Sequence, residues 1–410
     1  MTEPAADRHI VVVGASLAGT RAAQGLRALG HSGPITLIGA EDELPYDRPP
    51  LSKNLLHDAW SEASVDGIRL ATRAELDEIG VALRLGSAAV GLDTATRHVR
   101  LADGSSVSYD ALVIATGAAA RTSPWRPPSG VYQLRTLDDA RAIAARLALG
   151  EPVVVVGGGF IGTEIAAAAV RHGCPVTVVD PLTQPMARLV GPEIAGSLVE
   201  LHHRQGVRTR FGTGVVGIEG KDGDLTVELD DGEHLLASTA VVGIGSVPSA
   251  DWLTGSGLTV ADGVVTDRFL RADGADDVYA IGDVARWPHS GHGADVRAEH
   301  WTNASDQARY VATALTKGVE AGYEPTDYVW SDQYDWKVNS FGRRDPAGSS
   351  IVIGDLGTDG RTAVVHADAD GVACGAVTVN WVRALNQARR LLSAGRASAD
   401  SIAAVVRRLP

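Results

Sequence analysis

Two glycine-rich segments of this chain have the spacing that binds the diphosphate of a dinucleotide. In such a turn the first glycine permits a tight bend, the second lets the backbone approach the diphosphate, and the third lets helix and strand pack closely. The later segment has all three glycines and consists of Gly157, Gly158, Gly159, Phe160, Ile161 and Gly162. The earlier segment has serine in the second position and consists of Gly14, Ala15, Ser16, Leu17, Ala18 and Gly19. Because serine is small and can itself donate a hydrogen bond, we expect both turns to bind a nucleotide; the alternative for either is a tight turn without a ligand.

An acidic residue follows the second turn at the end of the next predicted strand. Asp180 stands 18 residues after Gly162. A carboxylate in that position accepts hydrogen bonds from the ribose hydroxyls and repels a 2′-phosphate. No Arg or Lys follows before Arg188, so the pattern favours NADH over NADPH. The alternative is that Asp180 is only a turn residue before Pro181.

The residues around each turn predict a strand, a helix and a second strand. Ile10–Val13 is too short for a helix and suits a buried parallel strand, and Ile35–Ile38 predicts its neighbour. The alanine-rich stretch between them has helical spacing. The later copy has a helical stretch at Ile165–Val170 and a strand at Val176–Val179. Two such units, 143 residues apart, predict two separate dinucleotide-binding folds in one chain.

Each unit continues with a predicted β-hairpin and a last buried strand that ends in glycine. In the first unit this strand is Ala111–Ala115, followed by Thr116 and Gly117. In the second unit it is Ala240–Ile244, followed by Gly245. The two copies therefore repeat one another beyond the glycine-rich turn.

A further predicted strand, Val278–Ile281, leads into Gly282 and Asp283. Gly282 allows close approach of a ligand, and the Asp283 carboxylate could accept a hydrogen bond from the ribityl chain of a flavin. A lone Gly-Asp pair is usually only a turn. Here it accompanies two nucleotide-binding patterns, and that combination suggests a flavin served by a nicotinamide.

The rest of the chain predicts a third region of mixed structure beyond Glu324. The expected elements are a helix at Thr302–Thr316, strands at Ser350–Ile353, Thr362–His366 and Val372–Val379, and a helix at Val382–Ala394. 

Composition excludes several classes of protein. The chain has 410 residues and a net charge of −13, which argues against nucleic acid as the partner. Its two cysteines, Cys174 and Cys374, exclude a disulfide scaffold and a Cys-x-x-Cys redox pair, and no metal site is expected. No apolar run approaches the roughly 20 residues of a membrane span, and the polar N-terminus lacks a signal-peptide pattern. We therefore expect a cytoplasmic protein without a membrane partner.

Six motifs give the sequence a specific resemblance. They are LPYDRPPLSK at Leu44–Lys53, ATG at Ala115–Gly117, LRTLDDA at Leu134–Ala140, GGGFIGTE at Gly157–Glu164, YAIGDVA at Tyr279–Ala285 and WSDQY at Trp330–Tyr334. In these motifs, over nearly its whole length, the chain resembles the FAD-dependent NADH:ferredoxin reductases that serve oxygenases. This family of putidaredoxin, dioxygenase-ferredoxin and rubredoxin reductases has the glutathione-reductase-type fold.

The resemblance implies which residues bind the two cofactors. The implied FAD contacts are Gly14, Ala15, Ser16, Leu17, Ala18, Gly19, Glu41, Arg48, Lys53, Ala89, Ala115, Thr116, Gly117, Arg135, Gly282, Asp283, Trp301 and Trp330. The implied NAD contacts are Gly157, Gly158, Gly159, Phe160, Ile161, Gly162, Glu164, Asp180, Ile244 and Gly245. One position departs from the family pattern, because Ala40 stands where an acid usually holds the FAD ribose, and Glu41 is the nearest candidate.

Lys53 and Glu164 are the residues that the resemblance places closest to the chemistry. It implies that Lys53 lies near the reactive edge of the flavin ring and that Glu164 pairs with this lysine beside the nicotinamide pocket. A buried Lys–Glu pair can hold a positive charge there without leaving an uncompensated ion. Phe160 resembles the gate between the two rings. The alternatives without a functional role are that Lys53 is a solvated loop lysine and that Glu164 is an ordinary acid at the start of a helix.

The predicted protein is an α/β flavoprotein with two Rossmann-like domains and a C-terminal α+β domain. The predicted FAD domain spans 1–112 and 247–324, the NAD domain 113–246, and the C-terminal interface domain 325–410. Its expected activity is that of an FAD-dependent ferredoxin–NAD(+) reductase, passing electrons from NADH through FAD to a small [2Fe–2S] or similar ferredoxin that serves an oxygenase. The alternatives are an NADH-responsive flavoprotein resembling apoptosis-inducing factor and a flavin oxidase or disulfide-type reductase. Monomer and homodimer remain open.

Overall fold

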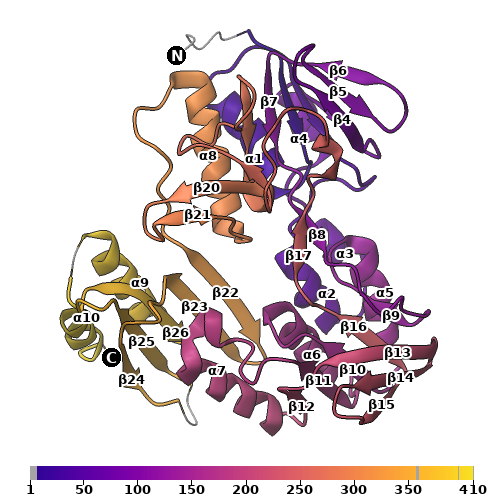
Figure 1. Ribbon diagram of the computed structural model, residues 1–410, viewed down its shortest axis with the longest axis vertical. Helices are drawn as coiled ribbons and strands as arrows, with labels where there is room; N and C mark the ends of the chain where they lie inside the picture. The colour runs from indigo at the N-terminus through magenta and orange to yellow at the C-terminus, as the bar shows by residue number, and fades with distance from the viewer. Residues whose placement is uncertain (1–6, 357–359, 396, 410) are drawn as a thin grey trace. The chain divides into compact units, whose positions relative to one another are not determined.

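The computed structural model describes residues 7–356, 360–395 and 397–409, which fold into two compact units (Figure 1). Unit 1 takes its described residues from Met1–Asp47, Val65–Ala119 and Ser246–Pro325. Unit 2 takes its described residues from Arg48–Ser64, Ala120–Gly245 and Thr326–Pro410. Each unit is built around a parallel β-sheet with helices, so the predicted α/β fold class is confirmed.

The sheet of unit 1 has the strand order β19-β7-β1-β2-β3. Its strands are β1 (Ile10–Val13), β2 (Ile35–Ile38), β3 (Val81–Arg84), β7 (Ala111–Ile114) and β19 (Val278–Ala280), all parallel. Ile10 and Val12 pack under α1 (Leu17–Ala28) and α8 (Trp301–Lys317), which lie side by side in Figure 1. Val11 and Val13 point to the opposite face. Burial on both faces is why the strand is an unbroken β-branched run.

The opposite face of this sheet is covered by a small antiparallel sheet. It consists of β4 (Ala89–Asp93), β5 (His98–Leu101) and β6 (Ser106–Ser108), which together form the hairpin expected in the first unit. The other elements of unit 1 are α4 (Arg73–Glu78), β17 (Ser246–Pro248), η2 (Asp251–Leu253), β18 (Val264–Val265), η3 (Gly282–Val284), β20 (Ala285–His289) and β21 (Ala294–Val296). Two short elements contain residues of both units, α3 (Glu62–Asp66) and β8 (Ala118–Ala120).

Unit 2 repeats this architecture with the strand order β12-β11-β10-β16-β9. The strands are β9 (Val131–Tyr132), β10 (Val153–Val156), β11 (Val176–Asp180), β12 (Arg208–Phe211) and β16 (Thr239–Val242). One face packs against α5 (Leu137–Leu147) and α6 (Phe160–Arg171). The other face packs against the antiparallel strands β13 (Val215–Lys221), β14 (Asp224–Leu229) and β15 (His234–Ala237). The repeat read from the sequence is therefore a repeat in three dimensions.

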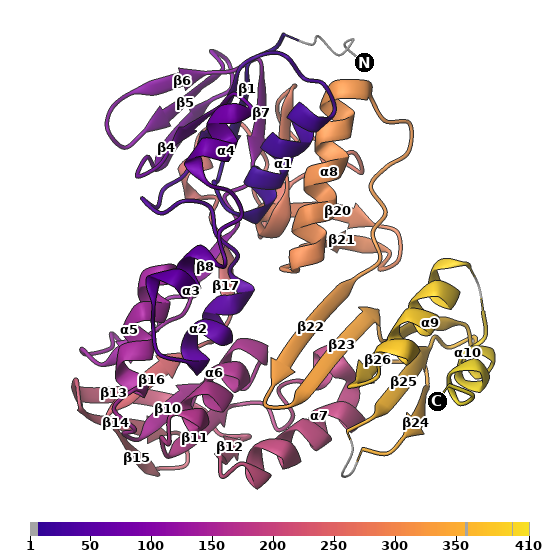
Figure 2. The same cartoon turned by 180° about the vertical axis from the view of Figure 1, so that it is seen from behind.

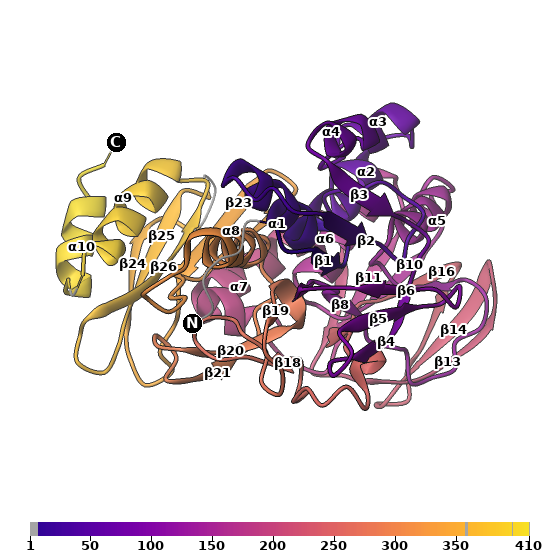
Figure 3. The same ribbon diagram turned by 90° about the horizontal axis from the view of Figure 1, so that it is seen from above.

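The C-terminal residues of unit 2 form an antiparallel sheet in the order β22-β23-β26-β25-β24. Its strands are β22 (Tyr328–Gln333), β23 (Trp336–Gly342), β24 (Ser350–Gly354), β25 (Thr362–Ala367) and β26 (Ala373–Val379). One face packs against α9 (Val382–Ser393) and α10 (Ala399–Val406), seen from two directions in Figures 2 and 3. The other face packs against α7 (Ala187–Arg204).

Residues 48–64 belong to unit 2 although the first glycine-rich turn belongs to unit 1. They form η1 (Pro49–Ser52) and α2 (Asn54–His57), and Leu56 is buried in the core shared with α5 and α6. Unit 2 contains residues 120–245 of the predicted NAD domain and the described residues of the predicted C-terminal domain from Thr326 on, whereas residues 113–119, 246 and 325 belong to unit 1. The three-domain division read from the sequence stays a prediction.

Within the described ranges, no helix combines the length and the apolar character needed to cross a bilayer.

Candidate functional site

The first glycine-rich turn connects β1 to α1 in unit 1. Gly14 has a φ of +118°, and a Cβ there would overlap the carbonyl oxygen of Ala115. A Cβ at Gly19 would overlap the carbonyl oxygen of Gly14. Ser16 immediately precedes the first helical residue, so the free N–H groups of the first turn of α1 lie beside it. The turn thus has the geometry that a diphosphate-binding turn needs.

Two further predicted FAD segments lie at the same edge of the sheet. Ala115 hydrogen-bonds through its N–H to Val13, and Thr116 donates its hydroxyl hydrogen to the carbonyl of Ser249 (2.7 Å). Gly282 follows β19, and a Cβ there would lie 3.2 Å from the Cβ of Ala18 in α1. The sequence-predicted Gly282 is therefore brought against the first turn of α1, and Asp283 follows it in η3.

Two of the remaining predicted FAD residues of unit 1, Glu41 and Trp301, are anchored by residues that sequence reasoning missed. Tyr46 donates its hydroxyl hydrogen to Glu41 Oε2 (2.6 Å), which holds that carboxylate in place. Trp301 begins α8, and its indole N–H donates to Asp47 Oδ1 (2.7 Å). Tyr46 and Asp47 both stand in the LPYDRPPLSK motif, so the motif itself was the available signal. Ala89 begins β4.

Four predicted FAD residues belong to unit 2: Arg48, Lys53, Arg135 and Trp330. Arg48 donates through Nη1 to the carbonyl oxygen of Arg135 (2.5 Å), so these two are brought together. Trp330 stacks on Tyr328 within β22, with 5.9 Å between ring centroids.

The second glycine-rich turn connects β10 to α6. Gly157 has a φ of +113°, and Cβ atoms at Gly157 and Gly162 would overlap the carbonyl oxygens of Gly243 and Gly157, respectively. Gly159 differs, because a Cβ there would meet no protein atom within 4 Å. Packing therefore explains the first and last glycines. The open space at Gly159, directly before the N-terminus of α6, is where a diphosphate would approach the backbone.

Asp180 ends β11 beside this turn. Its Oδ2 accepts the N–H of Gly158 (2.8 Å) and its Oδ1 accepts the N–H of Leu182 (2.8 Å). The carboxylate thus ties the glycine-rich turn to the strand end, which is part of the structural alternative. Each oxygen keeps a second lone pair for a ribose hydroxyl. These contacts agree with the structural alternative, and ribose binding by Asp180 stays a prediction.

Other predicted NAD residues line the same edge of the sheet or the start of α6. Ile161 is half exposed at 50% in the first turn of α6, and Phe160 packs against the core formed by α7 and the C-terminal sheet. Gly245 has a φ of +105° and follows Ile244 beyond the end of β16, and its carbonyl accepts the N–H of Arg121 (2.9 Å).

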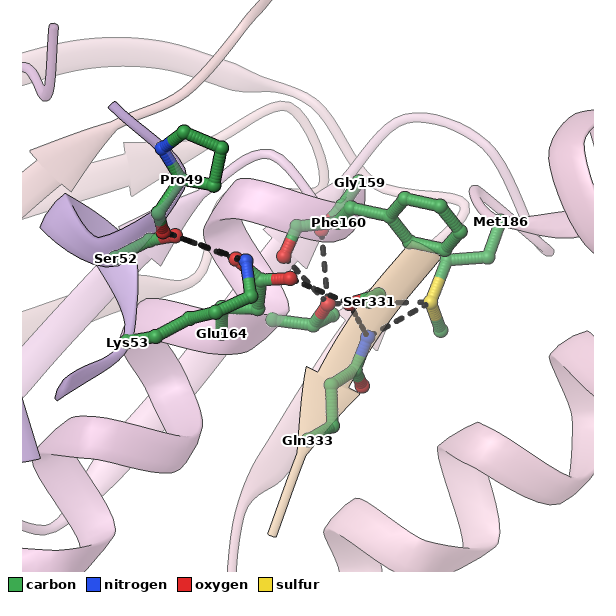
Figure 4. Close-up of polar contacts among 10 residues, drawn as sticks. Pro49, Ser52, Lys53, Gly159, Phe160, Glu164, Met186, Ser331 and Gln333 are labelled. Atoms are coloured by element: carbon green, nitrogen blue, oxygen red, sulfur yellow. Dashed lines mark hydrogen bonds and ion pairs between the residues drawn. The ribbon is translucent and has the colours of Figure 1, made fainter. Parts of the chain in front are cut away.

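Lys53 and Glu164 form an ion pair inside unit 2 (Figure 4). Lys53 Nζ lies 2.8 Å from Glu164 Oε2, and the side chains are 13% and 3% exposed. Ser52 donates its hydroxyl hydrogen to the same carboxylate oxygen (2.5 Å). Because a buried carboxylate without a partner is costly, the pair accounts for a charge at this depth. The solvated-lysine alternative does not fit this geometry.

The other oxygen of Glu164 has a partner that the sequence did not reveal as a site residue. Ser331 of β22 donates its hydroxyl hydrogen to Glu164 Oε1 (2.5 Å), and Gln333 donates through Nε2 to Ser331 Oγ (3.1 Å; Figure 4). Ser331 and Gln333 are both 0% exposed. Both are letters of the WSDQY motif, and their two-residue spacing on a strand puts them on one face. That alternation was the missed signal.

Comparison with known proteins defines the class to which this chain belongs. Residues 8–308 match the family model described as pyridine nucleotide-disulphide oxidoreductase, and residues 328–406 match the model described as reductase C-terminal. The chain belongs to the pyridine nucleotide-disulphide oxidoreductase family.

Individual relatives narrow this class and confirm the resemblance to ferredoxin reductases. The chain is 38% identical to the anthranilate 1,2-dioxygenase system ferredoxin–NAD(+) reductase component of Burkholderia cepacia, covering 94% of each protein. It is 38% identical to rhodocoxin reductase of Rhodococcus erythropolis, covering 85% of this chain and 81% of that one. Among solved structures, putidaredoxin reductase in its covalent complex with putidaredoxin superimposes with a TM-score of 0.91 at 30% identity, covering 97% of this chain and 96% of that one.

The two cysteines are placed as structural residues. Both are free thiols; Cys174 is buried beneath α6 and Cys374 lies in β26. Burial raises the pKa of each thiol above its usual value. Because the thiolate is the reactive form, neither is prepared for disulfide exchange.

Proposed function

We propose that this protein is an FAD-dependent ferredoxin–NAD(+) reductase, which takes electrons from NADH and delivers them through FAD to a small iron–sulfur ferredoxin that serves an oxygenase. The observation that carries the proposal is the duplicated turn. Gly14 and Gly157 both have a left-handed φ, and both stand at the same junction of a parallel strand and a helix. One chain thus offers two dinucleotide sites. The relatives named as reductase components of oxygenase systems give the acceptor class.

The residues of unit 1 fit the dinucleotide part of FAD. The turn from Gly14 to Gly19 offers backbone N–H groups and the positive end of the α1 dipole to a diphosphate. Gly282 lies against that turn, and the carboxylate of the adjacent Asp283 would accept hydrogen bonds from the hydroxyls of the ribityl chain. Glu41, held by Tyr46, is the acid available to the adenosine ribose.

The residues of unit 2 fit NADH. Gly159 leaves open space before α6 for the diphosphate, and Asp180 closes β11 as the acid that accepts ribose hydroxyls. A 2′-phosphate beside this carboxylate would be repelled, so NADH is the preferred donor. Lys53 and Glu164 would position the nicotinamide and tune the flavin. When bound, FAD accepts a hydride and passes the electrons on singly.

The disulfide-type alternative loses support from the chemistry of the thiols. The family name includes disulfide reduction, yet both cysteines of this chain are single, and burial raises the pKa of each. We therefore propose that the electrons pass to an external carrier and not to a disulfide of this chain. A cytoplasmic location belongs to the same proposal, since free thiols suit a reducing compartment.

The test is an anaerobic visible spectrum of the purified protein before and after one equivalent of NADH, followed by an oxidised [2Fe–2S] ferredoxin. We expect a flavin spectrum that bleaches with NADH, bleaches more slowly with NADPH, and returns when the ferredoxin is added. A colourless protein that cannot be reconstituted with FAD contradicts the flavin assignment. A flavin that NADH does not bleach contradicts the donor. Rapid oxygen uptake without any carrier, or NADH-dependent dimerisation with no ferredoxin reduced, points instead to an oxidase or a signalling flavoprotein.

A further inference from the structure

A buried chain of polar side chains continues inward from the Lys53–Glu164 pair. His202 of α7 lies 2.9 Å from Gln333 Oε1 through its Nε2, and Tyr334 Oη lies 3.1 Å from His202 Nδ1. The rings of His202 and Tyr334 also meet edge to face at 5.1 Å. His202 is 2% exposed and Gln333 is 0% exposed. Burying this many polar groups is costly unless each is paired, and each of these is.

The charge of Glu164 fixes the direction of every hydrogen bond in the chain. An ionised carboxylate can only accept, so Ser331 must donate its single hydroxyl hydrogen to Oε1. Ser331 Oγ must then accept from the amide nitrogen of Gln333, which turns Gln333 Oε1 toward His202. His202 therefore carries its proton on Nε2.

The far end of the chain agrees with this direction. Burial lowers the pKa of His202 to about 4, so the ring is neutral at physiological pH and its Nδ1 can accept. Burial raises the pKa of Tyr334, which keeps its hydroxyl protonated as the donor to that nitrogen. All donors thus point toward Glu164.

Such a chain orients a group rather than conducting protons. A proton relay needs members that give up one proton as they receive another, and the Gln333 amide does not do this at neutral pH. With Lys53 and Ser52 on Oε2 and Ser331 on Oε1, the carboxylate has donors on both oxygens and one defined orientation.

We propose that Ser331 and Gln333 of β22, backed by His202 and Tyr334, are positioning residues that hold the Glu164 carboxylate on Lys53, so that the C-terminal sheet sets the geometry of hydride transfer. This inference rests on the proposed function, since it assigns a role in NADH-dependent flavin reduction. None of these four residues is among those for which we propose a contact with FAD or NADH.

The test compares Ser331→Ala with Ser331→Thr, which keeps the hydroxyl, in the FAD-loaded protein. We expect Ser331→Ala to lower the limiting rate of anaerobic flavin reduction by NADH about tenfold or more, as loss of orientation does. FAD content should stay unchanged, and Ser331→Thr should recover most of the rate. Ser340→Ala, on the neighbouring strand β23 and outside the chain, is the matched control and should behave as the unsubstituted protein. A normal rate in Ser331→Ala, or an equal loss in Ser340→Ala, overturns the proposal.

A second measurement does not use NADH. Thermal-unfolding midpoints of Ser331→Ala, Glu164→Gln and the double variant form a cycle that reports whether the two side chains act together. We expect the double variant to lose clearly less than the sum of the single losses, and strict additivity overturns the contact. If the unsubstituted protein is not reduced by NADH, the proposed function fails, while the cycle still decides whether Ser331 holds Glu164.

Discussion

Lys53 carries its charge in a mostly buried position. Its ammonium group is mostly buried at 13% exposure and lies 2.8 Å from a carboxylate that is itself 3% exposed. A surface ion pair is worth little, but a buried pair is strongly destabilised when only one partner is removed. Substituting Lys53 therefore tests whether its charge is needed for function.

Lys53→Ala should reduce flavin reduction by NADH at least tenfold, or cost the protein its FAD. The reason is that Glu164 would keep its charge in a buried place with only hydroxyl donors left. FAD content and the rate of NADH-dependent dye reduction are the two measurements. Lys221→Ala, on the exposed end of β13, is the control. Unchanged FAD content together with an unchanged rate would remove Lys53 from the mechanism.

The burial of His202 predicts that the protein becomes less stable as the pH falls below neutral. Burial lowers the pKa of its folded form to about 4, whereas the unfolded chain takes up a proton near the ordinary value of 6.5. Between these two pH values the unfolded state binds more protons, so the free energy of unfolding falls as pH falls. The loss reaches roughly 3 kcal/mol by about pH 4 and is absent above about pH 7. His366, whose pKa burial also lowers to about 4, adds a loss of the same sign.

The measurement is the thermal-unfolding midpoint at pH 7, 6 and 5. His202→Gln should start from a lower midpoint at pH 7 and then fall less steeply than the unsubstituted protein. His203→Gln, at the exposed neighbouring position of α7, should keep the original slope. Parallel curves for the unsubstituted protein and His202→Gln would refute the assignment.

Sequence reasoning predicted those candidate site residues whose role depends on local pattern. The glycines and Asp180 follow from spacing, and Lys53 and Glu164 follow from motif resemblance. The sequence can place Ser331 and Gln333 on one strand face, but it cannot pair Ser331 with Glu164 or Gln333 with His202, because those contacts cross from β22 to α6 and α7. Only the fold of unit 2 brings these positions, more than 120 residues apart, into hydrogen-bonding distance.

At the scale of elements, strands and helices with a simple period were predicted well. β1, α1 and α8 agree with the sequence expectation within a few residues, because buried β-branched runs and helical spacing leave few alternatives. The expectation did not include α7, which is interrupted at Gly191, with a φ of +79°, before Pro192. A helix broken by that pair carries no continuous period, although residues on both sides of the break pack on the C-terminal sheet.

Two glycine substitutions in the turn between β10 and α6 should have different effects, one on NADH binding and the other on stability. Gly159→Ala should leave folding and FAD content unchanged and weaken NADH binding about tenfold or more, because its Cβ meets no protein atom but fills space for the diphosphate. Gly157→Ala should destabilise the protein, since its Cβ would overlap Gly243 and its φ is +113°.

The measurements are thermal unfolding, FAD content and the dependence of flavin reduction on NADH concentration. Gly196→Ala, inside α7 with no atom within 4 Å of its Cβ, is the matched control and should be neutral or slightly stabilising. If Gly159→Ala binds NADH as tightly as the unsubstituted protein, the diphosphate does not approach this turn.

On the scale of the whole molecule, the charge distribution bears on the electron acceptor. The protein carries −13, and ferredoxins are commonly acidic, so docking needs a local positive surface. Candidate residues for such a surface are Arg309, Lys337, Arg343, Arg344, Arg389 and Arg390. Arg309 lies in unit 1 and forms an ion pair with Asp306, so its positive charge is partly compensated and it is a weaker candidate for docking. The other five belong to unit 2.

Helix α9 is the element of unit 2 best suited to such a surface. It contains no acidic residue, and Arg383, Arg389 and Arg390 are exposed on it. The Arg389 guanidinium lies over the rings of Tyr328 and Phe341, at 5.6 and 5.3 Å from their centroids. This stacking fixes the position of a charge that would otherwise move freely, and so lowers the entropy cost of using it in docking.

Ferredoxin reduction should therefore depend on salt. We expect kcat/KM for an acidic [2Fe–2S] ferredoxin to fall about tenfold between low and physiological ionic strength, because exposed charges are screened beyond a Debye length of about 8 Å. The double variant Arg389→Glu/Arg390→Glu should show the same fall at low salt, while NADH-dependent reduction of an uncharged quinone dye stays constant. Arg309→Glu is the control on α8. A rate that is independent of salt, or a double variant that reduces ferredoxin normally, would mean that docking depends on shape and apolar contact and that α9 is not the surface used.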